Sequence, residues 1–258
     1  MASHPAKVLV DHCAIENGRT TRLVGVTETV TWGTKRVQVK VARIQGKRLQ
    51  KNEEWLRNER RSLATVAAAA RNGLITVHTS LELVAERLRA RSTGRGIRGD
   101  LWIAVRFEHA PAPLDRSTWM GSLSLQQMAS KEHREEFYSQ MLALAHHGVP
   151  QQLLDALPTT EFVERQKANL SRLREYASLC DVVGSKRRGD AFHYWTAICN
   201  NLDYFLTTDK RFVEGLRKHS NKDLIGRAVT PSELVRVLHL PPTTLPIAEG
   251  EITPFATE

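Results

Sequence analysis

The sequence predicts an α/β fold built on a mainly parallel sheet. Short apolar runs that suit buried strands alternate with longer segments of helical character along the 258-residue chain. Hydrophobic residues make up 41% of the chain and charged residues 25%, which is enough for a packed core and excludes a disordered protein. We therefore expect a three-layer α/β/α sandwich that also contains an inserted β-hairpin and a helical insertion.

The first expected elements are a short strand and a hairpin. Residues 7–10 (KVLV) form an apolar run that ends at Asp11, as in a strand buried within a parallel sheet. Residues 22–44 contain two alternating runs on either side of Gly33 and Thr34, which predicts a β-hairpin with one polar face. We assign four basic residues to that polar face: Lys35, Arg36, Lys40 and Arg43.

A helix, a strand and a second helix are expected next. Good helix formers fill residues 51–72 up to Gly73, a residue type that often follows a helix end. Residues 74–79 (LITVHT) predict a second buried strand. Ser80 then stands at a typical N-cap position before a helix that begins LELVAERLRA.

The middle of the chain changes from strand to helix character. Residues 101–107 (LWIAVRF) predict a third strand, and the prolines of 110–118 predict a loop. From 122 to 180 the pattern is amphipathic and helical, which predicts a helical insertion. Its expected helices are 123–147, 150–157 and 160–180.

Two more strands and their helices complete the expected sheet. A basic loop at 185–189 precedes a helix that begins at Asp190. Short strands are expected at 204–207 (YFLT) and 226–229. The helices of this region are 190–201, 209–218 and 231–239.

The chain is expected to form one domain in the cytoplasm. Residues 1–240 contain all the expected strand–helix units, and the prolines of 241–258 predict an extended or mobile tail. No apolar stretch reaches the ~18–20 residues that cross a bilayer, so no membrane association is expected. The N-terminus lacks the pattern of a secretory signal, and three cysteines without metal or redox spacing predict reduced thiols.

The charge balance favours a polyanionic partner. The chain contains 37 lysine and arginine residues against 28 aspartate and glutamate residues, a net charge of +9. Nucleic acid is the first expectation for such a chain, although charge that only maintains solubility is the simpler alternative. The candidate residues for binding a nucleic-acid backbone are Lys186, Arg187, Arg188, Arg87 and Arg91.

Acidic residues stand next to several of the expected strands. Asp11 follows strand 7–10, Asp209 lies two residues after strand 204–207, and Asp190 opens the helix before that strand. Because ligands bind at the carboxyl ends of strands in an open α/β sheet, these side chains can meet at one edge. Converging carboxylates repel one another unless a cation compensates them, and Mg²⁺ prefers oxygen ligands. Such an ion could activate water against a phosphodiester.

Each acidic residue also has a purely structural interpretation. Asp190 and Asp209 are suited to cap the helices that they precede, and Asp11 is suited to a turn. Glu82 and Glu86 lie in the first turns of the helix after strand 74–79, where many arginines offer surface ion pairs worth roughly 0.3–0.5 kcal/mol.

Four segments of the chain stand out together: VLVDHCAI at 8–15, TSLELVAERL at 79–88, GDAFHYWTAICNNLDYFLTTDKRF at 189–212 and AVTPSELVRVL at 228–238. They resemble the PIN-domain ribonucleases, which include the VapC-like toxins of toxin–antitoxin systems. The segment at 189–212 is the most specific of the four. Together they cover the sheet core, about half of the chain, whereas the hairpin and the helical insertion enlarge it beyond the usual toxin.

The resemblance implies an endoribonuclease that depends on Mg²⁺ or Mn²⁺. It carries the family's acidic quartet onto Asp11, Glu86, Asp190 and Asp209 as metal ligands and catalytic residues, with Glu82 as the alternative to Glu86. Thr208 would hydrogen-bond a ligand carboxylate or the substrate.

The resemblance also implies partners. An RNA substrate is expected, together with an inhibitory antitoxin-like protein if the chain is a toxin or defence effector, and a homodimer is a further expectation. Two other functions stay open: a nucleic-acid-binding protein that uses the same fold without catalysis, and a structure-specific DNA nuclease.

Overall fold

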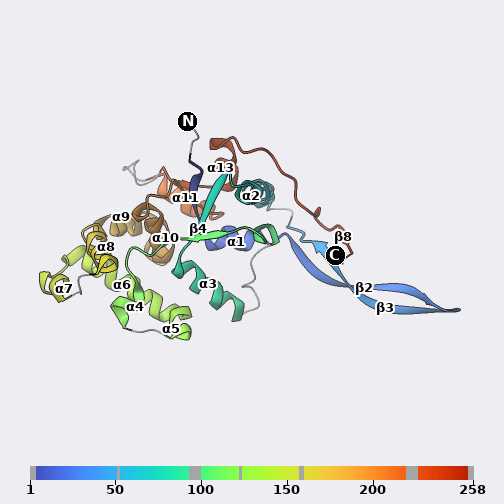
Figure 1. Cartoon of the computed structure of the whole chain (residues 1–258), viewed down its shortest axis with the longest axis horizontal. Helices are drawn as coiled ribbons and strands as arrows, with labels where there is room; N and C mark the ends of the chain where they lie inside the picture. Colours follow the sequence, from blue (N-terminus) through green and yellow to red (C-terminus); the bar gives the residue numbers. More distant parts are fainter. Residues whose placement is uncertain are drawn as a thin grey trace.

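The computed structural model describes residues 4–50, 53–92, 100–121, 124–156, 160–218 and 226–254. Within them the chain forms a five-stranded parallel sheet in the order β5-β4-β1-β6-β7 and a separate antiparallel sheet in the order β2-β3-β8 (Figure 1). The strands of the parallel sheet are β1 (Ala6–Val10), β4 (Ile75–Thr79), β5 (Phe107–His109), β6 (Tyr204–Leu206) and β7 (Ala228–Val229). The expected α/β class with a parallel sheet is confirmed.

Hydrophobic clusters lie against both faces of the parallel sheet. In β1, Val8 and Val10 belong to one cluster and Leu9 to the other, and all three side chains are fully buried. Successive side chains of a strand point to opposite faces of the sheet. Burial on both faces explains why the strand appears in the sequence as an unbroken apolar run.

Three helices contribute to the cluster that contains Val8. They are α1 (His12–Asn17), α2 (Glu54–Arg71) and α13 (Pro231–Val237). Helix α2 is rich in alanine, the residue with the highest helix propensity, and it buries Leu63 and Val66 with several of these alanines. It ends before Gly73, whose φ of 71° is easily adopted only by glycine.

An aromatic cluster fills the opposite face. It joins α10 (Arg188–Cys199) to α6 (Lys131–His147) and α9 (Leu173–Val183). The ring of Phe192 lies 5.5 Å from Phe137 and 5.9 Å from both Tyr176 and Trp195, in edge-to-face arrangements. Such contacts add to the hydrophobic effect and fix the helical region against the sheet.

The helical region between 122 and 180 is confirmed, but it is divided into more helices than expected. Ser130 ends the expected 123–147 helix early, because its backbone is extended (φ −64°, ψ 134°) and its hydroxyl caps α6 by accepting from the His133 amide. Two residues of the expected helices, at 123 and 157, lie outside the described residues. The other helices of this region are α5 (Leu125–Ala129), α7 (Gln151–Ala156) and α8 (Glu161–Leu170), and α4 (Arg116–Met120) precedes it.

The expected strand at 101–107 is wrong. A short 3-10 helix, Asp100–Trp102, occupies its first two residues, and β5 begins only at Phe107. The Asp100 carboxylate accepts from the Thr20 amide at 2.6 Å, and the buried Trp102 indole donates to the Ala14 carbonyl at 3.2 Å. These tertiary contacts turn the segment inward, which strand propensity alone does not predict.

The expected hairpin is confirmed as β2 (Thr21–Trp32) and β3 (Lys35–Gly46), paired over their whole length. The assignment of its cations to a single face is wrong. Lys35 pairs with Trp32 and Arg43 with Val24, whereas Arg36 and Lys40 pair with threonines on the other face. The basic residues are therefore divided between both faces.

The C-terminal segment is not a free tail. Strand β8 (Ile252–Thr253) pairs antiparallel with β3 at the base of the hairpin. The segment also runs along α2, where the Thr243 amide donates to Thr65 at 3.0 Å and Glu249 pairs with Arg57 at 2.9 Å. These contacts hold the segment against the rest of the protein, and residues 255–258 lie outside the described part of the chain.

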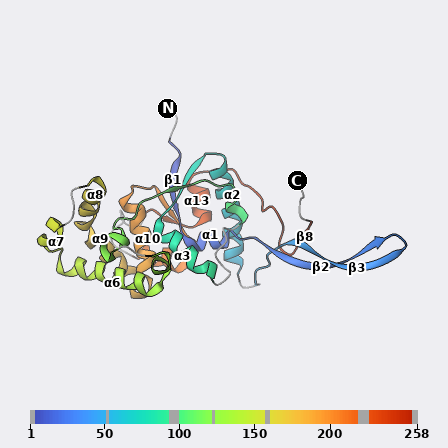
Figure 2. The same cartoon turned by 60° about the horizontal axis from the view of Figure 1, so that its bottom comes forward.

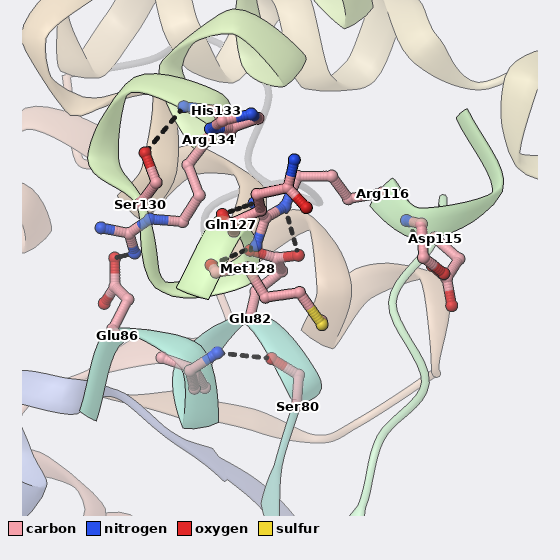
Figure 3. Close-up of polar contacts among 12 residues, drawn as sticks. Ser80, Glu82, Glu86, Asp115, Arg116, Gln127, Met128, Ser130, His133 and Arg134 are labelled. Atoms are coloured by element: carbon pink, nitrogen blue, oxygen red, sulfur yellow. Dashed lines mark hydrogen bonds and ion pairs between the residues drawn. The ribbon is translucent and has the colours of Figure 1, made fainter. Parts of the chain in front are cut away.

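Buried ion pairs tie α3 (Leu81–Ser92) to the helical region (Figure 3). Arg116 makes two hydrogen bonds to Glu82, at 3.0 and 3.1 Å, and donates to the Met128 carbonyl at 2.7 Å. Its side chain is fully buried and that of Glu82 is 3% exposed. Since a buried charge is costly without its partner, this pair fixes α4 and α5 over α3.

Among the helices that the structure describes, none is sufficiently long and apolar to span a membrane.

We predict that Arg116→Ala destabilises the protein by about 3–5 kcal/mol, because it leaves the Glu82 carboxyl group buried without its partner. The double variant Glu82→Gln with Arg116→Met should recover most of this loss, since neither side chain then carries a charge. Urea denaturation followed by circular dichroism measures both. A double variant as unstable as the single one would show that the packing of Arg116, not its charge, matters.

Candidate carboxylate site

The site begins where strand order reverses in the parallel sheet. From β1 the chain adds β4 and β5 on one side, and later β6 and β7 on the other. The carboxyl ends of β1 and β6 therefore flank the crevice in which open α/β sheets bind ligands. Asp11 directly follows β1, and Asp209 lies three residues after the end of β6.

Thr207 joins these two acidic segments. Its hydroxyl donates to Asp11 Oδ2 at 2.8 Å and accepts from the Asp209 amide at 3.1 Å. Cys13 also donates to Asp11 Oδ2, at 2.8 Å. Burial and the Asp11 charge raise the pKa of Cys13 well above its usual range, so its thiol keeps the proton that it donates. The buried Asp11 carboxylate is thus held in one orientation.

Asp209 has a structural role as well as a place in the site. Its Oδ1 accepts from the Phe212 amide at 3.0 Å, which caps α11 (Lys210–Leu216). Its Oδ2 lies 3.5 Å from Arg187 Nη1. The helix-capping interpretation of Asp209 is therefore confirmed, and one carboxylate oxygen still faces a cation.

Asp190 lies in the first turn of α10, not at its N-cap, because the helix already begins at Arg188. The expected basic loop before it is a 3-10 helix, Ser185–Arg187, that leads into α10. Burial raises the pKa of Asp190 from 3.8 to about 7, and the charges of Asp11, Glu86 and Asp209 add to this rise. The four acidic residues of the predicted quartet therefore lie close enough for three of them to act on the pKa of the fourth, Asp190.

Glu86 is held by two basic residues from different elements. Arg134 Nη1 of α6 lies 2.5 Å from Glu86 Oε1, and His193 Nε2 of α10 lies 3.5 Å from Glu86 Oε2. Burial alone would raise the pKa of Glu86, but His193 and Arg134 outweigh it and lower that pKa to about 2. Burial likewise disfavours charge on His193, yet the Glu86 carboxylate raises its pKa. Glu86 is therefore ionised, and Arg134 and His193 compensate its charge.

Two predicted supporting residues have other roles. Glu82 is buried against Arg116, so its expected place beside the site is wrong, and Glu86 is the glutamate coupled to the aspartates. Thr208 accepts from the Asn17 amide at 2.8 Å, and it is Thr207 that bonds the carboxylate of Asp11.

The basic residues that were predicted to bind a nucleic-acid backbone differ in their surroundings. Lys186 is exposed, Arg187 faces Asp209, and Arg188 donates to Ser139 at 2.8 Å. Arg87 is half-buried on α3, and the side chain of Arg91 lies outside the described residues. Of these residues, Arg187 is the one with a carboxylate of the site as its neighbour, and Lys186 is next to it in the chain and open to solvent.

Four further residues of the site were not among the predicted site residues: Cys13, Arg134, Thr207 and His193. His193 stands three residues after Asp190 and so shares its helix face, a spacing in the sequence that points to it. Arg134 gives no signal, because it reaches Glu86 from a different helix.

The donor chemistry of this site fits a hard divalent cation, although the side chains do not form a ready ligand set. Carboxylate oxygens are the ligands that Mg²⁺ prefers, and Asp190 meets uncompensated neighbouring charge. However, across the residues that the structure describes, no three histidine, cysteine, aspartate or glutamate side chains are arranged to hold a metal ion. Glu86 is instead engaged with Arg134 and His193.

Comparison with known proteins gave no match: no family model, curated protein or solved structure is similar to this chain.

We predict that Asp190→Asn stabilises the protein at alkaline pH but not under acidic conditions. The native carboxyl binds its proton more tightly than the unfolded chain, so stability falls as the pH rises from about 4 to about 7. The variant lacks this loss and should be more stable by on the order of 2–4 kcal/mol at about pH 8.

Urea denaturation at several pH values in the presence of a chelator measures the effect. Asp181→Asn, on the exposed surface of α9, is the matched control and should change little. Equal stabilisation of the Asp190 variant at every pH would contradict the raised pKa.

Proposed function

We propose that the protein is a metal-dependent endoribonuclease with a PIN-like three-layer α/β/α fold, active in the cytoplasm. The observation that supports this most directly is the link through Thr207, which bonds both the Asp11 carboxylate and the Asp209 backbone amide at the strand switch point. Asp190 and Glu86 add their charges to the same region. A phosphodiester bond is the substrate that this acidic site in a basic protein suits best.

The chain's own residues divide the work in this proposal. Asp11, Asp190 and Asp209 would hold Mg²⁺ or Mn²⁺, which when bound supplies an activated water and stabilises charge on the phosphate. Thr207 keeps the Asp11 carboxylate in orientation, and Asp190 holds a proton near neutral pH until the surrounding charge is compensated.

Glu86 and the basic residues have positioning roles in this scheme. The Arg134 and His193 side chains fix the Glu86 carboxylate at the edge of the site. Arg187, 3.5 Å from Asp209, is placed to take a phosphate oxygen, and the exposed Lys186 can hold the neighbouring phosphate. The inhibitory partner and the homodimer stay predictions.

We predict that Asp11→Asn, Asp190→Asn and Asp209→Asn each lower metal-dependent RNA cleavage at least about a hundredfold, because each removes a charge that stabilises the bound cation. Cleavage of a labelled single-stranded RNA in Mn²⁺ or Mg²⁺, with and without chelator, measures it. Asparagine still caps helices well, so the Asp209 variant should keep α11 intact.

Asp115→Asn is the matched control, since Asp115 also caps a helix, α4, but lies outside the carboxylate site. It should cleave like the unmodified protein. Binding of RNA without cleavage, unchanged by the site variants, would favour the non-catalytic alternative. Cleavage confined to DNA would favour a DNA nuclease.

A further inference from the structure

The β2–β3 hairpin projects from the body as a ribbon (Figures 1 and 2). Its strands have twelve residues each, a length of about 40 Å at ~3.3 Å per residue. The third strand, β8, pairs with it only at Ile44 and Gln45. Since an isolated two-stranded ribbon is only marginally stable in water, its outer part is suited to hold a partner.

The end of the ribbon presents an aromatic ring beside cations. Trp32 is 82% exposed, the highest fraction among the exposed large hydrophobic side chains. Lys35 is its direct cross-strand neighbour, and Val30 and Val37 form the next pair on the same face. Arg36 follows Lys35 on the opposite face, paired with Thr31. An exposed tryptophan next to two exposed cations offers a stacking surface and charge together.

The net charge of the ribbon is strongly positive. It contains five basic residues and one acidic residue, Glu28. Arg43 neutralises that residue through a hydrogen bond of 2.7 Å, so the remaining cations have no acidic residue on the ribbon. The partner of this surface is therefore expected to be polyanionic. A second copy of the ribbon would bring like charges together.

We propose that the tip of the ribbon, Trp32 with Lys35 and Arg36, binds single-stranded nucleic acid. Trp32 stacks on an unpaired base, and Lys35 and Arg36 contact the flanking phosphates. An indole can stack only on a base whose face is free, so a duplex is a poor ligand for this tip. The inference rests on the proposed function for its expected RNA ligand, while stacking and phosphate contacts suit RNA and DNA strands alike.

The ribbon also connects directly to the carboxylate site. Asp11 caps α1, and β2 begins four residues after that helix ends. Asn17 of α1 donates to Thr208, so the base of the ribbon is anchored beside the site. A strand bound along the ribbon would therefore be led toward the carboxylates.

The test is fluorescence anisotropy with labelled oligouridine and oligothymidine, and with a duplex of the same length, in chelator so that no cleavage occurs. Trp32→Leu should weaken binding of single strands about tenfold, whereas Trp32→Phe should retain most of it, because phenylalanine still stacks. Lys35→Gln with Arg36→Gln should lower the slope of log affinity against log salt by about 1.4.

Lys131→Gln with Arg174→Gln is the matched control, since both are exposed cations on α6 and α9. It should leave binding within about twofold of the unmodified protein. Four results would each overturn the inference. They are ribbon variants that bind single strands normally, equal binding by the leucine and phenylalanine variants, self-association that depends on Trp32, and equally strong binding of the duplex.

The two proposals fail separately. Loss of ribbon binding with RNA cleavage that still depends on Asp11 would remove only the ribbon inference. Binding that depends on Trp32 without any metal-dependent cleavage would remove only the nuclease proposal.

Discussion

The parallel pairing of β1 with β6 brings together charges that would otherwise repel one another. Val10 and Leu206 are paired at the ends of these strands, so the residues that follow them emerge side by side. Thr207 then bridges Asp11 and the Asp209 backbone, and α10 adds Asp190 to the same edge. The two hydrophobic clusters hold the strands in this register, and burial, together with the repulsion that remains between the carboxylates, raises the pKa of Asp190.

The helical region acts on this site through two ion pairs of α3. Glu82 and Glu86 stand one helical turn apart, yet the first is sealed against Arg116 and the second faces Arg134 and His193. Figure 3 shows both glutamates reaching up from α3 toward the helices above it. One pair fixes the region in place, and the other compensates a carboxylate of the site, so the packing of these helices and the charge of the site are coupled.

The periodicity and turn chemistry of the chain predicted most of the elements. Residues such as the apolar run of β1, the turn at Gly33 and the alanines of α2 each favour one local structure strongly. The errors came where a tertiary contact outweighs the local pattern. Trp102 buries its ring against α1, and β8 joins a sheet whose other strands lie some two hundred residues earlier in the chain.

The α/β class, the hairpin and the position of three aspartates next to strand ends or helix starts follow from the residues alone, because they depend on short-range periodicity and capping. Three features depend on the packing of the folded chain: which glutamate joins the aspartates, that Thr207 and not Thr208 bonds Asp11, and that Arg134 and His193 compensate Glu86. The partners in these contacts come from separate elements, and their approach depends on how helices pack across the sheet. No local pattern of residues encodes how closely two side chains from separate elements approach each other.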